Sequence, residues 1–363
     1  MTKPIKMFQL DRLWSEIKDQ TLDLIDKSNA SGYGQRGPAV TQLETQLKSW
    51  SNRKHAITVA SCTDALLCAI ESLKLPRGSY IATPSLTFTA VASRIVCAGM
   101  IPYFVDIDEY GHLDLNKIPE ICSALIVVDL FGCAMDYDKL AIWQKNNPHC
   151  KVIMDAAQSI ETIYNGQYSL SQGHIAVTSF SPSKTIPSWG SGGAIFTDDD
   201  EVANFANQWR THGKKKNEDT AAMYGANSML GTMEAAQILV VADKRHYRRA
   251  RREEIAKHYI NEMRPTTLKP LPQRGIHTWH KFVVHAGEYQ DAVVARLQEN
   301  NIECKVFYKP LIHQEPLYEN FPQTDMTNSK KFIETTIAIP CQSTLNVDEV
   351  GRIGDILRSF KCV

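Results

Sequence analysis

Lys184 is the residue of this sequence whose setting points most directly to chemistry. It lies in SFSPSKTIPSWGSGGAIFTDD, residues 179–199, where an apolar strand is predicted to end at Phe180 and a glycine-rich turn leads into another strand. Open parallel α/β sheets bind ligands at the carboxyl ends of their strands. A lysine there can form a Schiff base if low polarity or nearby positive charge lowers its pKa. This segment alone fits an ordinary surface lysine equally well.

Asp155 stands at a second predicted strand end, in KVIMDAAQ at residues 151–158. A carboxylate in that place can face a ring nitrogen and keep it protonated, which makes a pyridine ring an electron sink. An ion pair of this kind is favoured where water is excluded. The alternative is a helix cap at the turn from strand to helix, which is a common position for aspartate.

A strand-to-helix turn in SCTDALLCAIESL, residues 61–73, offers a place for a phosphate group. Cys62 and Thr63 lie where the free backbone N–H groups and the dipole of the following helix attract an anion. Plain capping is the alternative for this turn. Phe88, in PSLTFTAVAS at residues 84–93, either lies flat on a cofactor ring or is a core phenylalanine.

These features follow one another along one predicted sheet, and each suits a different part of the same cofactor. The turn at Cys62 and Thr63 can hold a phosphate, and Phe88 can cover a ring face. Asp155 can pair with a ring nitrogen, and Lys184 can form a Schiff base. Pyridoxal 5′-phosphate (PLP) carries all four of these parts. We therefore predict a PLP enzyme in which Lys184 forms the Schiff base.

The elements that must position these residues are apolar strands separated by helices. Helices are predicted over residues 63–73 and 88–97, and several of the strands are continuous apolar runs, as in strands that are covered on both faces. The alternation predicts an α/β fold with a mainly parallel, seven-stranded sheet sandwiched by helices. The predicted strands are HAITVAS, SYIATP, IPYFVDID, SALIVVDLF, KVIMDAAQ, HIAVTSF and GGAIFTD.

The last third of the chain has a different pattern. A helix is predicted in EVANFANQWRTHG, and one long helix with a charged face over residues 233–263. After the proline-rich RPTTLKPLP come a strand (TWHKFVVHA), a helix (YQDAVVARLQENN), a strand (IECKVFY, residues 302–308) and a final helix (VDEVGRIGDILRSF). We predict a large PLP-binding domain with an N-terminal helix at residues 1–240, and a smaller C-terminal α+β domain at residues 241–363.

Composition excludes several other classes of protein. Lys+Arg and Asp+Glu both number 40, so the formal net charge is zero and nothing favours nucleic acid or an acidic membrane as a partner. The basic runs are residues 214–216 and 248–252, and the second is expected on a solvated helix face. The nine cysteines form no CxxC pair, which argues against zinc and disulfides and favours the reducing cytoplasm. Neither a secretory signal nor a run of about 20 apolar residues is found.

Taken in order, these motifs resemble the DegT/DnrJ/EryC1/StrS family of PLP-dependent nucleotide-sugar aminotransferases, which have the aspartate aminotransferase fold (fold type I). The resemblance runs from about Gly32 to the C-terminus. The final stretch, residues 305–318, looks like the family's C-terminal substrate loop. The matching stretches are GQRGPAVTQLE, SCTDALLCAI, TFTAVASRIVCAGMIPYFVDID, DAAQ, SFSPSK with GSGGAIFTDD, YGANSMLGTMEAAQ and KVFYKPLIHQEPLY.

The resemblance implies a role for each residue that matches a family motif near the cofactor ring. Lys184 carries the Schiff base and moves the proton between the substrate carbon and the cofactor. Asp155 pairs with the pyridinium nitrogen, and Gln158 hydrogen-bonds the phenolic oxygen of the ring. Phe88 stacks on the ring face.

The resemblance also implies how the cofactor's phosphate is held. Ser179 and the backbone around Cys62 and Thr63 are expected to bind it within one subunit. Asn227 is expected to reach the phosphate in the neighbouring subunit. The family therefore implies a homodimer with shared active sites.

The implied reaction moves an amino group from L-glutamate to a nucleotide-linked keto-sugar. Tyr308 and His313 fall in the loop that borders the sugar, and this loop looks more like that of enzymes acting at C4 of 4-keto-6-deoxyhexoses, such as perosamine synthases. A C3 aminotransferase, a PLP-dependent sugar dehydratase and a regulatory relative are the alternatives. Arg210 and residues 214–216 are candidate cations for the nucleotide diphosphate.

Four residues depart from the family pattern and leave the sugar and the position of amination less defined. Cys62 replaces the usual glycine of the phosphate turn and raises the possibility of an oxidisable thiol beside the cofactor. Ser191 replaces an acidic residue, and Met229 stands where arginine is common. Ile160 lies near a position where histidine is frequent.

Overall fold

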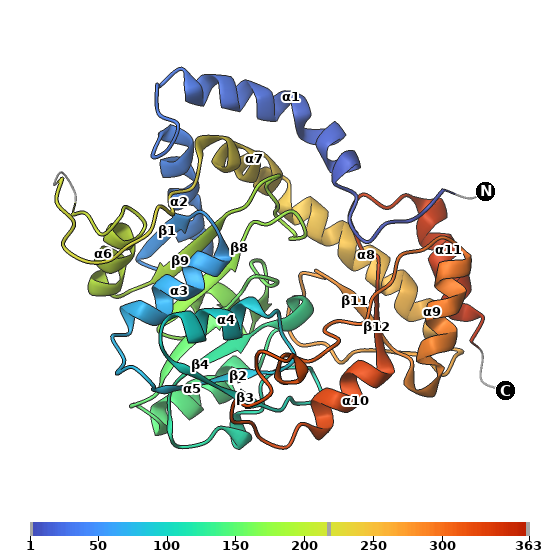
Figure 1. Ribbon diagram of the computed structural model, residues 1–363. Coiled ribbons are helices and arrows are strands. Elements are labelled where there is room, and N and C mark those ends of the chain that lie inside the picture. Colours follow the sequence, from blue (N-terminus) through green and yellow to red (C-terminus); the bar gives the residue numbers. More distant parts are fainter. Residues whose placement is uncertain (1–2, 216–218, 361–363) are drawn as a thin grey trace.

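A seven-stranded sheet forms the centre of the protein, which a computed structural model describes over residues 3–215 and 219–360 (Figure 1). The strand order is β1-β9-β8-β5-β4-β2-β3, and neighbouring strands are parallel except where β9 is a partner. All seven are strands that the sequence predicts, so the mainly parallel α/β sheet is confirmed. They are β1 (His55–Val59), β2 (Tyr80–Pro84), β3 (Ile101–Val105), β4 (Cys122–Val128), β5 (Lys151–Asp155), β8 (Ile175–Ser179) and β9 (Gly193–Thr197).

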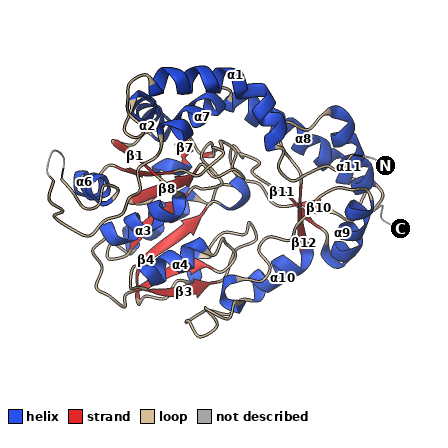
Figure 2. Ribbon diagram, turned by 45° about the horizontal axis from the view of Figure 1, so that its top comes forward, coloured by secondary structure: helices blue, strands red, loops and turns tan. Residues whose placement is uncertain are grey.

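Helices cover both faces of this sheet (Figure 2). One face, with Ile126 and Ile153, packs against α3, α4 and α6, and the other, with Leu125 and Val152, packs against α1, α2, α5 and α7. Successive side chains of a strand alternate between the two cores, which explains the continuous apolar runs. The helices are α1 (Leu10–Asn29), α2 (Pro38–Ser51), α3 (Cys62–Ser72), α4 (Ala90–Cys97), α5 (Tyr137–Asn146), α6 (Asp200–Trp209) and α7 (Thr232–Asp243).

The single long helix predicted over residues 233–263 is two helices, and that prediction is wrong. α7 ends at Asp243 and α8 (Arg245–Met263) begins after Lys244, whose φ of −97° and ψ of 17° interrupt the helix. α7 is apolar on nearly all sides, while α8 carries many charges, so the two segments suit different surroundings. Among the described residues, no helix is long and apolar enough to cross a membrane.

The expected solvated face of α8 is also corrected by the structure. Arg248 and Arg252 are each only 3% exposed. Arg252 lies 2.9 Å from the Glu161 carboxylate and donates to the Thr278 carbonyl oxygen at 2.7 Å. Arg248 lies 2.9 Å from Glu16 of α1. Buried guanidinium groups persist where such ion pairs and hydrogen bonds compensate for lost water, and a sequence pattern does not show those partners.

A small antiparallel sheet and its helices make up the C-terminal part, as the sequence predicts for an α+β unit. The sheet order is β10-β11-β12, and apolar side chains from β11, β12, α8, α9 and α11 form a core of their own. Ile5, near the N-terminus, packs into the same core. The elements are β10 (Lys269–Pro270), β11 (Phe282–His285), α9 (Gln290–Glu299), α10 (Thr327–Thr335), β12 (Thr336–Ile339) and α11 (Val347–Arg358).

One strand of this unit is placed differently from the prediction. Residues 302–308 form no strand and make only isolated bridges, from Ile302 to Ile5 and from Lys305 to Ala338. The third strand of the small sheet is β12. The sequence analysis missed this strand because no turn residues separate it from α10. A further hairpin, β6 (Ile163–Tyr164) and β7 (Gln167–Tyr168), reverses through an Asn-Gly turn typical of two-residue hairpins. The domain division stays a prediction.

Candidate active site

The predicted site residues gather at one edge of the central sheet. β1, β2, β4, β5 and β8 run in the same direction, so their carboxyl ends meet there. Asp155 and Ser179 are the last residues of β5 and β8, and Lys184 lies five positions beyond Ser179. Cys62 and Thr63 open α3 directly after β1. The parallel sheet therefore brings together residues that are widely separated along the chain.

Asp155 is a buried carboxylate, 5% exposed, at the end of β5. Its Oδ1 accepts a hydrogen bond from the Ala157 N–H at 2.9 Å, which is a local turn contact. Burial raises the pKa of Asp155, while the Ala157 hydrogen bond and the positive charge of Lys184 lower it. No side chain of the described residues hydrogen-bonds this carboxylate, so one oxygen is available to a cationic ring nitrogen.

Lys184 is presented by a tight turn after β8, in which its N–H donates to the Ser181 carbonyl oxygen at 2.9 Å. Burial lowers the pKa of the Lys184 amine, and the negative charge of Asp155 acts in the opposite direction. A lowered pKa increases the fraction of neutral amine, which is the form that attacks a carbonyl carbon. The side chain is half-buried, so a ligand at the sheet edge can reach it.

The turn before α3 combines a helix cap with free backbone donors. Ser61 Oγ accepts the N–H of Asp64 at 3.0 Å, so the capping alternative is correct for this serine. The N–H groups of Cys62 and Thr63 point out of the first helical turn and find no acceptor among the described residues. Burial, helped by the negative charge of Asp155, raises the pKa of the Cys62 thiol well above its usual value. The thiolate is disfavoured, which argues against the reactive thiol considered from the sequence.

Gln158 is held in one orientation by the protein. Its Oε1 accepts the backbone N–H of Phe131 at 2.9 Å, and its Nε2 donates to the Tyr308 hydroxyl at 3.2 Å. A backbone N–H can only donate, so the oxygen of this amide must face Phe131. The amide nitrogen retains a second hydrogen for a ligand. This contact also places Tyr308, from the C-terminal part, beside the end of β5.

Phe88 lies between β2 and α4 and is not a core residue, because 57% of its surface is exposed. Its ring is tilted by 51° relative to the Tyr308 ring, with 6.4 Å between the centroids. The two aromatic side chains flank the same edge of the sheet. An exposed ring in this place fits a stacking role better than the core alternative.

His280 is a site residue that the sequence analysis missed. Its Nε2 lies 3.0 Å from the carbonyl oxygen of Ser183, next to Lys184, and its Nδ1 lies 3.1 Å from Oε1 of Gln158. Burial and the positive charge of Lys281 lower the pKa of His280 well below its usual value. A neutral imidazole has one N–H, so only one of these contacts is a hydrogen bond at a time. The segment TWHKFVVHA indicated a strand, and nothing in it singled out this histidine.

His313 lies in a short 3₁₀ turn (Ile312–Gln314) and is 7% exposed. Its Nδ1 is 2.6 Å from Ser85 Oγ, and its backbone N–H donates to the same oxygen at 3.2 Å. Burial lowers the pKa of His313. The histidine therefore ties the substrate loop to the segment after β2 that carries Phe88, and its predicted contact with the sugar stays a prediction.

Two further predictions concern the surface that follows α6. Asn227 is exposed, as is its neighbour Tyr224. Arg210 is a candidate for holding a diphosphate, but it donates to Glu44 at 2.6 Å and to the Thr58 carbonyl oxygen at 2.7 Å. Its positive charge is therefore balanced by Glu44 within this chain. Of the neighbouring candidates, Lys216 lies outside the described residues.

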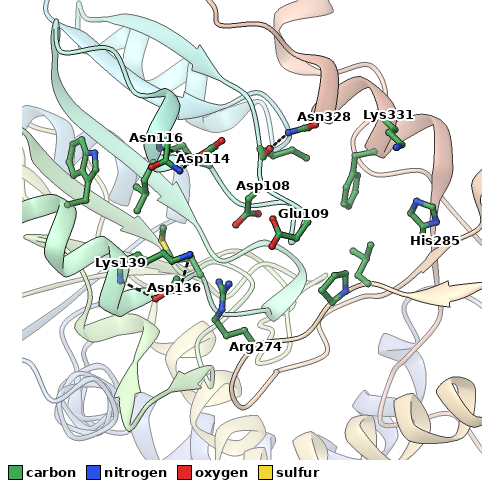
Figure 3. A pocket seen from close by; sticks show the side chains of 18 of the residues that line it. Asp108, Glu109, Asp114, Asn116, Asp136, Lys139, Arg274, His285, Asn328 and Lys331 are labelled. Atoms are coloured by element: carbon green, nitrogen blue, oxygen red, sulfur yellow. Dashed lines mark hydrogen bonds and ion pairs between the residues drawn. The ribbon is translucent and has the colours of Figure 1, made fainter.

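A large pocket of the described structure lies away from these residues. It has a volume of about 990 Å³ and none of the predicted site residues lines it. Asp108 and Glu109 point into it across from Arg274, and Lys331 borders it from α10 (Figure 3). This pocket is therefore separate from the strand ends that carry Lys184 and Asp155.

The chain also has relatives among known proteins. The model of the DegT/DnrJ/EryC1/StrS aminotransferase family matches residues 15–358. A UDP-2-acetamido-2-deoxy-3-oxo-D-glucuronate aminotransferase from Pseudomonas aeruginosa is 30% identical over 86% of this chain and 88% of its own. A dTDP-3-amino-3,6-dideoxy-alpha-D-galactopyranose transaminase from Aneurinibacillus thermoaerophilus is also 30% identical, over 91% of this chain and 92% of its own.

The fold has close counterparts among solved structures. The crystal structure of a DegT DnrJ EryC1 StrS aminotransferase from Brucella abortus superimposes with a TM-score of 0.92. It is 26% identical and the match covers 98% of this chain and 99% of the other. Solved structures of this fold include members that hold the pyridoxamine form of PLP.

Proposed function

This chain belongs to the DegT/DnrJ/EryC1/StrS aminotransferase family, the PLP-dependent aminotransferases of nucleotide sugars, and we propose that it transfers the amino group of L-glutamate to C3 of a nucleotide-linked keto-sugar. The observation that carries the proposal is the placement of the Lys184 amine and the Asp155 carboxylate at one sheet edge. Each affects the pKa of the other, so the two groups are electrostatically coupled in a site partly shielded from water.

The residues at the sheet edge fit PLP. The available oxygen of Asp155 suits the ring nitrogen, because a buried carboxylate without a side-chain partner favours a cation. The free N–H groups of Cys62 and Thr63, at the positive end of α3, suit the phosphate, and Ser179 lies at the adjacent strand end. Lys184 supplies the covalent attachment. Bound there, PLP supplies an electron sink for the carbon that loses or gains a proton.

The side chains of this protein have separate tasks in the transfer. The Lys184 amine, whose pKa is lowered by burial, would move a proton between the substrate carbon and the cofactor. Asp155 holds the ring-nitrogen proton in place. Gln158, fixed by Phe131 and Tyr308, presents an N–H to an oxygen at the ring. Phe88 covers one ring face and limits the entry of water.

C3 is proposed as the position of amination because the two relatives at 30% identity are named for it. One acts on a 3-oxo-glucuronate and the other on a 3-amino-3,6-dideoxygalactose. The resemblance of residues 305–318 to the loop of perosamine-synthase-like enzymes keeps C4 of a 4-keto-6-deoxyhexose as the second candidate. Which carbon meets Lys184 depends on how the loop with Tyr308 and His313 orients the sugar ring.

The remaining parts of the proposal concern assembly and location. A homodimer with shared active sites is supported by the exposure of Asn227 together with exposed Tyr224 and Met233 on the adjoining surface segment. A two-domain division at residue 240 is supported by the separate apolar core of the C-terminal part. A cytoplasmic location is supported by the eight cysteines of the described residues, all of which are free thiols.

An absorbance spectrum before and after L-glutamate tests the first half of the reaction. The lysine-linked cofactor has a visible band that disappears when the amino group is taken up, because the conjugated imine is lost. The second half is tested by giving the aminated enzyme 3-keto and 4-keto nucleotide sugars and identifying the product by mass spectrometry and NMR. Amination of the 4-keto sugar alone contradicts C3, and a band that glutamate leaves unchanged contradicts the donor.

A further inference from the structure

The buried amine of Lys281 has no counter-ion within residues 3–215 and 219–360. The residue is 4% exposed, and Nζ has no hydrogen-bond partner among the described residues. The amine lies over the ring of Phe8, at 3.8 Å from its centroid, and at 5.0 Å from the centroid of Phe307. Its charged neighbours are the cations Lys184 and Lys305, and with burial they lower the pKa of Lys281 well below its usual value.

Such an arrangement is unfavourable for the folded protein by itself. Burial of an ammonium group costs free energy unless an anion and hydrogen bonds replace the lost water. The two phenylalanine rings offer cation–π attraction, which offsets only part of that cost. A leucine or methionine would fill the same space without this penalty. The ligand-free protein therefore disfavours the protonated amine, and an anion that arrives with a ligand would stabilise that protonated form.

The contacts around Lys281 connect its amine to residues of the candidate site. His280, its neighbour in the chain, reaches both Gln158 and the Ser183 carbonyl oxygen next to Lys184. Tyr308, the neighbour of Phe307, receives the hydrogen bond from Gln158. Phe8, whose ring lies against the Lys281 amine, also lines the small pocket that contains Lys184.

We infer that Lys281 is a carboxylate-binding residue of the active site, which receives a carboxylate group of a substrate as its missing counter-ion. The inference rests on the proposed amino transfer. One ammonium group matches one carboxylate in charge, whereas the phosphate of the cofactor has its own donors at Cys62 and Thr63. Two substrates can bring such a group, namely the amino donor L-glutamate and a keto-sugar that is a uronic acid.

The variant Lys281→Met tests this role without confusing it with folding. Methionine keeps a long apolar side chain and removes the buried polar amine, so we expect the ligand-free variant to melt at a higher temperature than the wild type. A residue that only supports the fold would give the opposite shift. Lys269→Met is the matched control, because Lys269 lies exposed in β10, the strand that pairs with β11 directly after Lys281.

Two measurements then separate the sources of the carboxylate. The first is the rate of the cofactor's absorbance change as L-glutamate is varied. The second is calorimetric binding of UDP-glucuronic acid relative to UDP-glucose, which differ by the carboxylate. If Lys281→Met lowers the rate with L-glutamate tenfold or more, Lys281 binds a carboxylate of the amino donor. If the variant instead loses the preference for UDP-glucuronic acid over UDP-glucose, Lys281 binds the carboxylate of the sugar.

Changes below twofold in both measurements would overturn the inference, whatever the melting temperature. The control Lys269→Met is expected to stay within twofold of the wild type in both. A wild-type enzyme that does not react with glutamate would contradict the proposed donor, while the comparison of the two UDP-sugars would still test Lys281.

Discussion

Gly193 begins β9 directly against the first turn of α3, so that a Cβ at this position would come within 2.6 Å of the Cys62 nitrogen and within 2.7 Å of the Ser61 carbonyl oxygen. Both contacts are with backbone atoms, which cannot rotate away as a side chain can. The turn proposed to hold the phosphate is therefore positioned by a strand that lies more than a hundred residues later in the chain.

The Gly193→Ala variant is expected to displace this turn and weaken PLP binding about tenfold or more, because the free N–H groups of Cys62 and Thr63 would no longer point at the phosphate. The measurement is a titration of the apoprotein with PLP, followed by absorbance. Gly351→Ala is the matched control, since a Cβ there meets no atom within 4 Å and alanine favours the helix α11 that contains it. Equal PLP affinities for the two variants would contradict the packing argument.

Lys184→Ala is expected to abolish turnover and the visible band of the lysine-linked cofactor. The fold should persist, because the contact that shapes this turn is made by the backbone of Lys184 and not by its side chain. Circular dichroism and a melting curve provide the check on folding. Near-normal turnover by a folded Lys184→Ala protein would disprove its assigned role.

The reactivity of the Lys184 amine should rise with pH and reach half its maximum below 10.5, because burial lowers its pKa and the neutral amine is the reactive form. Asp155 acts in the opposite direction, so Asp155→Asn should move the midpoint to still lower pH. The measurement is acetylation of Lys184 in the apoprotein at a series of pH values, read by mass spectrometry. An upward shift in Asp155→Asn would refute the proposed coupling.

His280→Leu is expected to lower the rate about tenfold or more, because Gln158 and the turn before Lys184 lose a shared contact. His280→Gln retains an N–H donor and should recover part of that loss. The recovery distinguishes positioning from simple packing, which leucine would satisfy as well as glutamine. The readout is kcat for both variants beside their melting temperatures, and equal kcat values would leave positioning without support.

Glu349 links the C-terminal helix α11 to the N-terminal helix α1. Its carboxylate accepts from Arg12 at 2.5 and 2.6 Å, and the Glu349 N–H donates to Asn346 Oδ1 at 2.9 Å in a capping box. The hydrogen bonds with Arg12 hold the pKa of Glu349 below its usual value. Glu349→Gln should lower the free energy of unfolding by about 1–3 kcal/mol at neutral pH.

The pH dependence of that loss follows from the sign of the shift. A carboxylate whose folded pKa is depressed stabilises the protein fully above its unfolded pKa, about 4.5, and this stabilisation disappears as the pH falls through the folded value. Urea unfolding of wild type and Glu349→Gln between pH 7 and pH 3 should therefore converge at the acid end. A difference that stays constant over this range would show that the ion pair is not its source.

The sequence by itself determined the central sheet and the residues at its strand ends. Strands buried on both faces leave continuous apolar runs, so KVIMDAAQ and HIAVTSF marked both the strands and the positions of Asp155 and Ser179. Lys184 followed from the same local pattern. Parallel strands must place their carboxyl ends at one edge, and the convergence of these residues was therefore predictable without coordinates.

Only the tertiary structure decided which distant segments meet that edge. Gln158 contacts Tyr308, His280 contacts Ser183, and Lys281 has no anionic partner in the described part of the chain, all through the packing of the C-terminal part against the sheet. Local sequence sets hydrophobic periodicity and turn chemistry, but it does not encode which side chains face each other across more than ninety positions. Those pairings are set by how whole layers pack, because a buried charge or amide is satisfied or left unsatisfied only once every neighbouring segment is in place.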